Sequence, residues 1–189
     1  TTPVKTKQEE SYNGKKYMFW GSFRGIYATE LTDNGLEIKK KTDGTPVLKK
    51  RICGNRFEGT NIYKRGEYYY LFASIGTCCN GATSTYQTVV GRSKNVLGPY
   101  LDKTGRDMLY DYCEIIMSGN ETWAGPGHNS ILIQDDVGTD WIIYHGYKKK
   151  EAENGRYVLM DKLIWSNDGW PSVKSNAPSI LEVAPYFQK

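Results

Sequence analysis

Short runs of apolar and aromatic residues, separated by glycine and asparagine turns, dominate the chain from residue 12 onward. Within a run, polar and apolar positions alternate or the run is almost continuously apolar, which is typical of β-strands with one or both faces buried. No segment shows the 3.6-residue spacing of a helix over any length. We therefore expect an all-β chain, with strands at 16–20, 25–31, 36–38, 67–74, 86–93, 141–147 and 157–165.

A larger unit recurs along the chain: a turn, an aromatic strand ending in small residues, a polar loop, an alternating strand and a Gly-rich turn. Tyr17, Tyr69 and Ile142 occupy matching places in three copies. Repeats of this kind, with up to four strands each, are typical of β-propeller blades. A β-sandwich would also have short alternating strands but gives no reason for a repeat. The pattern favours about three propeller blades in residues 12–189, after a polar lead-in or linker at 1–11.

Composition narrows the classes of function. The 189 residues suffice for one domain with a sizeable core, and 15 of them are tyrosine. Tyrosine rings stack on sugars and their hydroxyls form hydrogen bonds, although half-buried strand positions explain most of them. The net charge of +4 is mild and the basic runs lie in loops, so we expect no nucleic-acid binding. No apolar run is long enough to span a membrane.

The four cysteines are Cys53, the adjacent pair Cys78 and Cys79, and Cys113. They match no metal-binding spacing. The sequence leaves open a disulfide from Cys53 or Cys113 to one member of the adjacent pair. A catalytic thiol would need a matching histidine and asparagine arrangement, which the sequence does not offer.

One carboxylate stands out by its position. Glu58 lies between Phe57 and Gly59, ahead of the aromatic strand at 67–74. A loop or strand end of this kind is where β scaffolds carry function. An isolated glutamate is more often a solvated surface residue, so the position by itself assigns no role.

An ordered series of motifs runs from residue 17 onward: residues 63–74, Cys78-Cys79-Asn80-Gly81, Ser84-Thr85-Tyr86, residues 90–93, Gly98-Pro99-Tyr100, residues 125–130, residues 144–147 and Gly169-Trp170-Pro171, together with Phe57-Glu58-Gly59. This series resembles glycoside hydrolase family 43, and its arabinanase-like branch in particular. Members of the family are five-bladed β-propellers that cleave arabinans and xylan side chains. The resemblance implies a secreted or periplasmic glycosidase acting on arabinan or a related polysaccharide that contains arabinose or xylose.

The resemblance also implies an inverting mechanism. Inversion needs a protonated carboxylic acid on the leaving-group side and a carboxylate base about 6.5–9.5 Å away. The family uses a third carboxylate to orient the acid. Glu58 matches the general acid, and Phe57 is expected to supply part of its apolar surroundings.

His128 lies in Gly125-Pro126-Gly127-His128-Asn129-Ser130 and matches a histidine that the family places at the propeller axis. There the resemblance implies a calcium or another metal ion with mostly water ligands. Calcium prefers oxygen ligands, so without the resemblance a histidine bonded to nearby backbone is the simpler interpretation. The second histidine, His145, ends an apolar strand and is expected to be structural or to face the sugar.

Besides lining Glu58, Phe57 is a candidate for substrate binding, and four further residues are candidates as well. Cys78 and Cys79 match a loop that forms the rim of the substrate site in the family, and Tyr86 follows in a matching motif. Arg92 ends an apolar strand, where an inward position paired with a carboxylate and a solvated position are equally compatible with the sequence.

Only one of the three carboxylates can be located. In the family, the base and the orienting aspartate precede the strand that matches 16–20, whereas residues 1–11 contain no aspartate. Asp33, Asp102 and Asp161 lie at turns or outer strands and are not expected to reach the channel. We therefore expect the last three of five blades, with no glycosidase activity in this chain alone.

Three blades do not close a propeller, so two blade faces would be left bare. Bare blade faces would expose apolar surface, which self-association or a complementary fragment would cover. The alternative function is a non-catalytic or degenerate propeller module that binds an oligosaccharide or polysaccharide.

Overall fold

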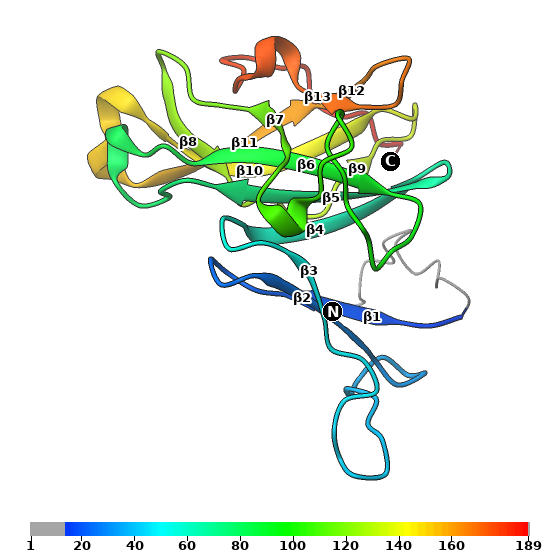
Figure 1. Cartoon of the computed structure of the whole chain (residues 1–189). Coiled ribbons are helices and arrows are strands. Elements are labelled where there is room, and N and C mark those ends of the chain that lie inside the picture. Colours follow the sequence, from blue (N-terminus) through cyan, green and yellow to red (C-terminus); the bar gives the residue numbers. More distant parts are fainter. Residues whose placement is uncertain (1–13, 189) are drawn as a thin grey trace.

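The computed structural model describes residues 14–188, so the predicted lead-in at 1–11 lies outside the described residues. Antiparallel strands form three sheets and one short hairpin (Figure 1). No helix among the described residues is long and apolar enough to cross a membrane. The strands are β1 (Tyr17–Trp20), β2 (Ile26–Glu30), β3 (Lys50–Cys53), β4 (Glu58–Arg65), β5 (Tyr68–Ile75), β6 (Gln87–Ser93), β7 (Glu114–Met117), β8 (Trp123–Gly127), β9 (Ile133–Gln134), β10 (Asp140–Lys148), β11 (Arg156–Lys162), β12 (Ile164–Trp165) and β13 (Pro171–Ser172), with short 3-10 turns η2 (Gly81–Thr83), η3 (Met108–Tyr110), η4 (Lys149–Asn154) and η5 (Lys174–Asn176).

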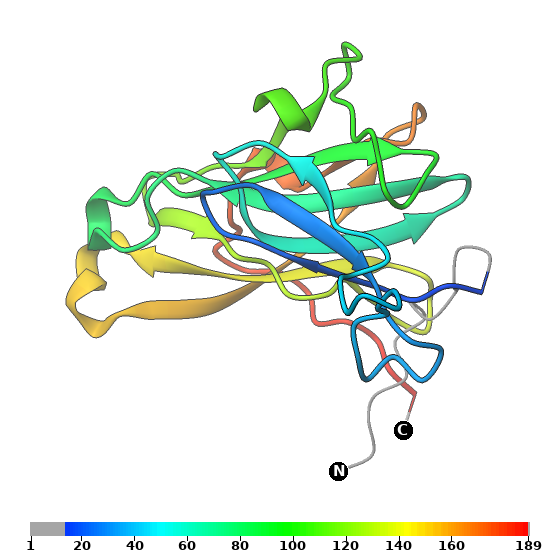
Figure 2. The same ribbon diagram turned by 60° about the horizontal axis from the view of Figure 1, so that its bottom comes forward.

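The sheets follow one another in chain order. The first sheet has the order β1-β2-β3, the second β4-β5-β6-β7, and the third β11-β10-β8 with β9 paired to β10. Strands β12 and β13 form the separate hairpin. Figure 2 shows the first sheet laid against a face of the second. The prediction of an all-β chain made of about three propeller blades is confirmed.

Two strand predictions need correction. The strand expected at 36–38 is only an isolated bridge between Leu31 and Ile38, inside a loop that projects away from the sheets (Figure 1). The strand expected at 157–165 is split at Leu163 into β11 and β12, because β11 pairs with β10 whereas β12 pairs with β13.

Strand β5 is buried on both faces, and its alternating side chains enter two different cores. Tyr69, Leu71, Ala73 and Ile75 join the cluster shared with the first sheet. The intervening Phe72 joins the cluster shared with the third sheet, as do Tyr70 and, from the next strand, Val90. Because successive side chains of a strand point to opposite faces, one strand holds three sheets together.

A buried carboxylate joins the second sheet to the third. Asp140 at the start of β10 accepts hydrogen bonds from the Tyr63 hydroxyl (2.8 Å) and the Trp165 indole (2.8 Å). The guanidinium of Arg65 lies 3.6 Å from the same carboxylate. Buried charges are retained where they are paired and hydrogen-bonded, and here the partners come from β4 and β12.

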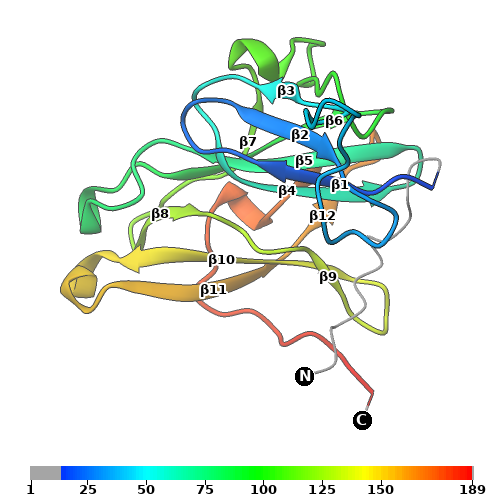
Figure 3. The same ribbon diagram turned by 90° about the horizontal axis from the view of Figure 1, so that it is seen from below.

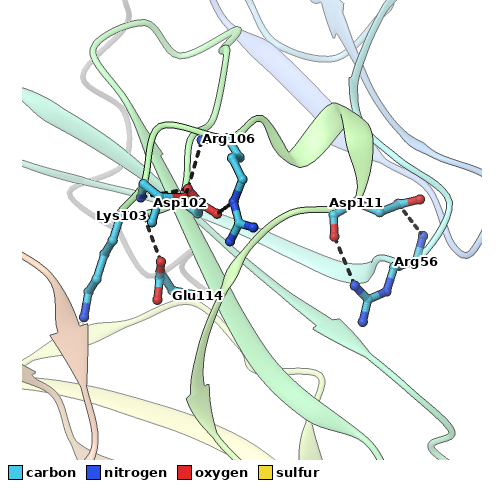
Figure 4. A network of polar contacts seen from close by, with 7 residues as sticks. Arg56, Asp102, Lys103, Arg106, Asp111 and Glu114 are labelled. Atoms are coloured by element: carbon cyan, nitrogen blue, oxygen red, sulfur yellow. Dashed lines mark hydrogen bonds and ion pairs between the residues drawn. The ribbon is translucent and has the colours of Figure 1, made fainter.

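Two of the three aspartates that are not expected to reach the channel have structural roles. Asp102 accepts hydrogen bonds from the Thr104 hydroxyl (2.8 Å) and the Arg106 guanidinium (2.8 Å) within its own loop (Figure 4). Asp161 on β11 accepts a hydrogen bond from the buried Tyr144 hydroxyl. Both carboxylates are buried and neither lines the Glu58 pocket, so neither is available there.

Truncation of β5 at Phe72 should destabilise the fold strongly. Phe72 is 0% exposed in the second core cluster, and replacing such a side chain by alanine typically costs about 3–5 kcal/mol. Urea unfolding of Phe72→Ala should therefore show a lower midpoint than wild type. Val158→Ala is the matched control, because Val158 on β11 is 79% exposed and should change stability by less than about 0.5 kcal/mol. Equal effects of the two substitutions would contradict the two-core arrangement.

Stability should also fall in acid through Glu30. This buried carboxylate on β2 accepts hydrogen bonds from Lys39 and Lys15, which hold its pKa below its ordinary value of 4.5. A lowered pKa in the folded state adds stability above the unfolded value, and that stability is lost as pH falls through the folded value. Urea unfolding of wild type and Glu30→Gln from pH 7 to pH 2 should show a gap that closes toward acid. A gap independent of pH would exclude this linkage.

Candidate active site around Glu58

One end of the stacked sheets gathers the polar residues that the sequence singled out. Glu58 begins β4 and pairs in register with Ser74 near the end of β5, while Tyr86 directly precedes β6. His128 follows β8, whose last residue, Gly127, pairs with His145. The loops that carry η2 and η4 lie side by side at this end (Figures 1 and 3).

Both carboxylate oxygens of Glu58 accept hydrogen bonds from hydroxyl groups. The Tyr86 hydroxyl donates to Oε1 (2.6 Å), and the Ser22 hydroxyl donates to Oε2 (2.7 Å). The hairpin that carries Ser22 is fixed to the start of β4 by a β-bridge between Ser22 and Glu58 and by the Phe23 amide, which donates to the Phe57 carbonyl (3.0 Å). The first and second sheets together therefore orient the carboxylate.

The backbone around Glu58 is shaped by a β-bulge. The register of β4 against β5 shifts between Glu58 and Asn61. Gly59, inside the bulge, has a φ of 63° and lies against His128, whose ring Cγ would be 3.1 Å from an added Cβ. Bulges turn side chains out of the regular alternation and are frequent next to active sites. The glycine thus lets the strand bend and lets His128 approach Glu58.

The segment that enters β4 is held from the other side by the loop around η3. The Arg56 amide donates to Asp111 Oδ1 (3.1 Å) and the Arg56 guanidinium donates to the Asp111 carbonyl (3.1 Å) (Figure 4). Gly54 donates its amide to the Met108 carbonyl (2.8 Å) and packs against Asp111 so closely that a Cβ would lie 2.1 Å from Oδ1. Glu58 therefore follows an anchored segment rather than a free loop.

Tyr86 is 0% exposed, so it supports Glu58 and does not contact a substrate directly, in contrast to the prediction. Its ring fills a space that exists because residue 127 is glycine, since an added Cβ there would lie 2.3 Å from Tyr86 Cδ1. The ring also stacks on His145, with centroids 5.9 Å apart. Burial, and then the bond to Glu58, raises the pKa of the Tyr86 hydroxyl far above its ordinary value, so it keeps its proton.

The two histidines stack beside this group, with ring centroids 6.2 Å apart. His128 is exposed, its amide donates to the Ser74 hydroxyl (2.8 Å), and its Nδ1 lies 3.4 Å from the Tyr86 hydroxyl. Burial lowers the pKa of His145 to about 4, so His145 is a neutral aromatic spacer between Tyr86 and His128 near neutral pH. His128 thus lines the same pocket as Glu58 rather than a core, and its position at a propeller axis stays a prediction.

The predicted metal ion can be compared with the donors around His128. The described part of the chain contains no group of three or more histidine, cysteine, aspartate or glutamate side chains that could hold a metal. Two buried oxygens of residues that line the same pocket, Thr60 Oγ1 and Asn129 Oδ1, have no hydrogen-bond partner. One imidazole and neutral oxygens fit a hydrated ion that keeps most of its waters, and they do not fit an ion enclosed by protein ligands.

A shallow pocket of about 260 Å³ opens beside Glu58, and Glu58 is the only carboxylate among its described lining residues. A wider depression of about 480 Å³ lies in the projecting loop between β2 and β3 and shares no residue with the first. The Glu58 pocket is lined by Phe19, Trp20, Gly21, Ser22, Glu58, Gly59, Thr60, His128 and Asn129.

Two further predicted binding residues are not at this pocket. Phe57 is 0% exposed inside the core between the first two sheets, so it does not contact a substrate. Arg92 lies toward the opposite end of β6, where its guanidinium covers the rings of Tyr68 and Trp170 and donates to the Asp168 carbonyl (2.6 Å). The aromatic and carbonyl groups there satisfy the cation, and the prediction that Arg92 binds substrate is wrong.

The cysteines also pair differently from the alternatives left open by the sequence. Cys78 and Cys79 form a disulfide with each other in the loop between β5 and β6, whereas Cys53 and Cys113 are free. Cys53 is buried in the first core cluster and Cys113 packs against it, so neither reaches the adjacent pair. The loop of the disulfide lies at the Glu58 end of the sheets, and contact of Cys78 and Cys79 with a substrate stays a prediction.

Sequence reasoning missed Ser22 and Gly127. Ser22 lies in a short glycine-serine turn, and only the pairing of the first sheet with β4 brings it to Glu58. The sequence presents Gly127 only as part of the motif around His128, whereas in the structure its missing side chain leaves room for the ring of Tyr86. No pattern within the sequence signals either contact.

Comparison with known proteins identifies relatives of this chain. The extracellular exo-α-(1→5)-L-arabinofuranosidase ArbA of Cellvibrio japonicus is 45% identical over 171 residues, which are 85% of this chain and 48% of that protein. The extracellular endo-α-(1→5)-L-arabinanase 1 of Bacillus subtilis is 36% identical over 162 residues, 85% of this chain and 47% of that protein. The chain thus spans about half the length of the curated relatives it matches.

Solved structures give the same result. The α-L-arabinanase of Cellvibrio cellulosa, in complex with arabinohexaose, superposes with a TM-score of 0.72 at 34% identity, over 87% of this chain and 55% of that one. An exo-1,5-α-L-arabinanase from a bovine ruminal metagenomic library gives a TM-score of 0.75 at 34% identity, over 87% and 54%. These relatives are five-bladed β-propellers. The model of the glycosyl hydrolases family 43 matches residues 8–171, and the chain belongs to this family.

Proposed function

We propose that this chain is part of a glycosidase that cleaves arabinan or a related polysaccharide containing arabinose or xylose, with Glu58 as the general acid. The observation that carries the proposal is a carboxylate with both oxygens held by hydroxyl groups, at the edge of an open pocket, in a member of a glycosyl hydrolase family. The names of the relatives, an arabinofuranosidase and an arabinanase, support arabinan as the substrate. Because both are described as extracellular, we also propose that the protein is secreted.

The chemistry follows from the roles that inversion requires. The proton of Glu58 passes to the glycosidic oxygen while the electron pair of the breaking carbon–oxygen bond moves to that oxygen. A water molecule adds to the opposite face of the anomeric carbon and loses its proton to a second carboxylate about 6.5–9.5 Å from the acid. Among the described residues that line the pocket, Glu58 is the only carboxylate, so the base comes from outside this set.

The remaining polar residues have supporting roles in this proposal. Tyr86 and Ser22 orient the acid, and His145 keeps Tyr86 and His128 in place through neutral ring contacts. His128 would be the one protein ligand of a hydrated calcium ion, near the unpaired oxygens of Thr60 and Asn129. When bound, such an ion would supply positive charge beside the substrate.

A non-catalytic carbohydrate-binding module is the second candidate. The observation in its favour is the single carboxylate of the pocket, because a proton donor without a base cannot complete hydrolysis. The outer face of the first sheet exposes the apolar side chains of Met18 and Trp20, and the Trp20 ring stacks on the half-buried Tyr27. We propose that this face is covered by further blades of a family domain or by a second copy of the chain.

Glu58→Gln should abolish hydrolysis while leaving folding and sugar binding almost unchanged. Loss of a general acid typically costs about 10²–10⁴-fold in turnover, and the amide keeps the shape of the side chain. The assay measures release of sugar from arabinan in whichever form of the protein is active, this chain alone or joined to the rest of a family domain. Glu67→Gln is the matched control, because Glu67 lies in the turn after β4 and pairs only with Lys94 on the surface. Near-normal turnover by Glu58→Gln would end the assignment.

Residues 1–189 by themselves should hydrolyse neither arabinan nor an aryl arabinofuranoside. The physical reason is that the described residues lining the pocket include no second carboxylate to act as the base, and without a base the barrier is at least several kcal/mol higher. The measurement is a turnover assay on the purified chain, run beside size-exclusion chromatography to record self-association. A compact monomer with robust turnover would show that another carboxylate acts as the base.

A further inference from the structure

The two oxygens of Glu58 have hydroxyl partners that differ in burial. Oε1 faces Tyr86, which is fully buried and does not line the pocket. Oε2 faces Ser22, which is exposed and lines the pocket together with Glu58. A carboxylic acid carries its proton on one oxygen at a time, so this asymmetry bears on which oxygen delivers it.

The Tyr86 hydroxyl has one short acceptor. Its oxygen lies 2.6 Å from Glu58 Oε1 and 3.4 Å from His128 Nδ1, and the first distance is that of a strong hydrogen bond between oxygens. The ring cannot turn away, since it is enclosed by Gly127 and stacked on His145. Tyr86 therefore donates to Oε1 whether Glu58 is ionised or protonated.

The Ser22 hydroxyl has no such restriction. A serine hydroxyl has one proton to donate and two lone pairs to accept with, and its proton rotates freely. At 2.7 Å from Oε2, Ser22 donates to the carboxylate and accepts from the carboxylic acid without any movement of heavy atoms. Oε2 is thus the oxygen that can gain and lose a proton at constant geometry.

We propose that Tyr86 and Ser22 are positioning residues that determine which oxygen of Glu58 carries the proton. Tyr86 always donates a hydrogen bond to Oε1, so Oε1 remains an acceptor. The proton is bound to Oε2 beside Ser22 and passes from Oε2 to the glycosidic oxygen. After transfer, Glu58 is a carboxylate that accepts hydrogen bonds from both hydroxyls. The inference rests on the proposed role of Glu58 as the general acid and adds which atom carries the proton and what selects it.

Infrared difference spectroscopy between acid and neutral solution tests the proton position without any turnover. Glu58→Gln identifies the carboxyl band of Glu58 in the purified chain. Tyr86→Phe should shift the carbonyl stretch of the acid to higher wavenumber, because Oε1 loses its donor. Gly127→Ala should shift it in the same direction, because the added methyl displaces the ring of Tyr86. Ser22→Ala should leave the carbonyl stretch near its wild-type position, since the carbonyl oxygen is not the one facing Ser22.

Kinetics with two kinds of leaving group test the consequence in the active form of the protein. Tyr86→Phe and Ser22→Ala should each lose about ten- to a hundredfold on arabino-oligosaccharides, whose leaving group needs a well-placed proton. Both variants should lose much less on a dinitrophenyl arabinofuranoside, whose leaving group departs unprotonated. Ser22→Thr, which keeps a hydroxyl, should restore most of the oligosaccharide activity. Tyr100→Phe is the control, because it removes a buried hydroxyl bonded to the Val96 carbonyl outside the pocket and should not separate the two substrates.

The outcomes separate this inference from the proposed function. A carbonyl band that moves in Ser22→Ala and stays in Tyr86→Phe would place the proton on Oε1 and overturn the inference. Equal losses of activity on the oligosaccharide and on the dinitrophenyl arabinofuranoside would show that Tyr86 and Ser22 have only structural roles, and would also overturn the inference. Full activity of Glu58→Gln would instead overturn the proposed function, while the infrared result would still report which oxygen is protonated.

Discussion

The structure depends on one strand that is buried from both sides. Leu71 and Ala73 of β5 pack toward the first sheet, and Phe72 between them packs toward the third. A strand of this kind has no solvent face, so a register slip by one residue would exchange the contents of two cores at once. The second sheet is therefore fixed in its plane, and the first and third sheets take their positions from it.

The positions of the site residues follow from the packing of the three sheets. Glu58 belongs to the second sheet, Ser22 to the first, and Gly127 and His145 to the third, so each sheet contributes at one shared end. Glycine at position 127 allows Tyr86 to cross from its own sheet toward the next one and still reach Glu58. Core packing fixes the backbones that carry Ser22 and Tyr86. Their hydroxyl groups therefore hold the carboxylate of Glu58 in place without a charged partner.

Glu58 is a carboxylate with a fixed position in the site. The pocket has one carboxylate among its described residues, while the chain spans about half the length of its relatives in a family of five-bladed propellers. Convergence of blades at an axis lets a second carboxylate come from a different sheet, in the same way that Ser22 and Glu58 already come from two. A propeller thus builds its site from distant segments, each held by its own blade.

The sequence by itself determined the strand pattern, the repeat of the blades, the family and the position of Glu58, because these follow from local alternation and from ordered motifs. It placed Phe57 and Arg92 wrongly, since whether a side chain faces a pocket, a core or an aromatic stack depends on which sheet lies beside it. Only the tertiary structure decided that Ser22 and Tyr86 hold the carboxylate of Glu58. Their partner lies 36 and 28 residues away in the chain, and such contacts arise from the packing of sheets, which leaves no period in the sequence.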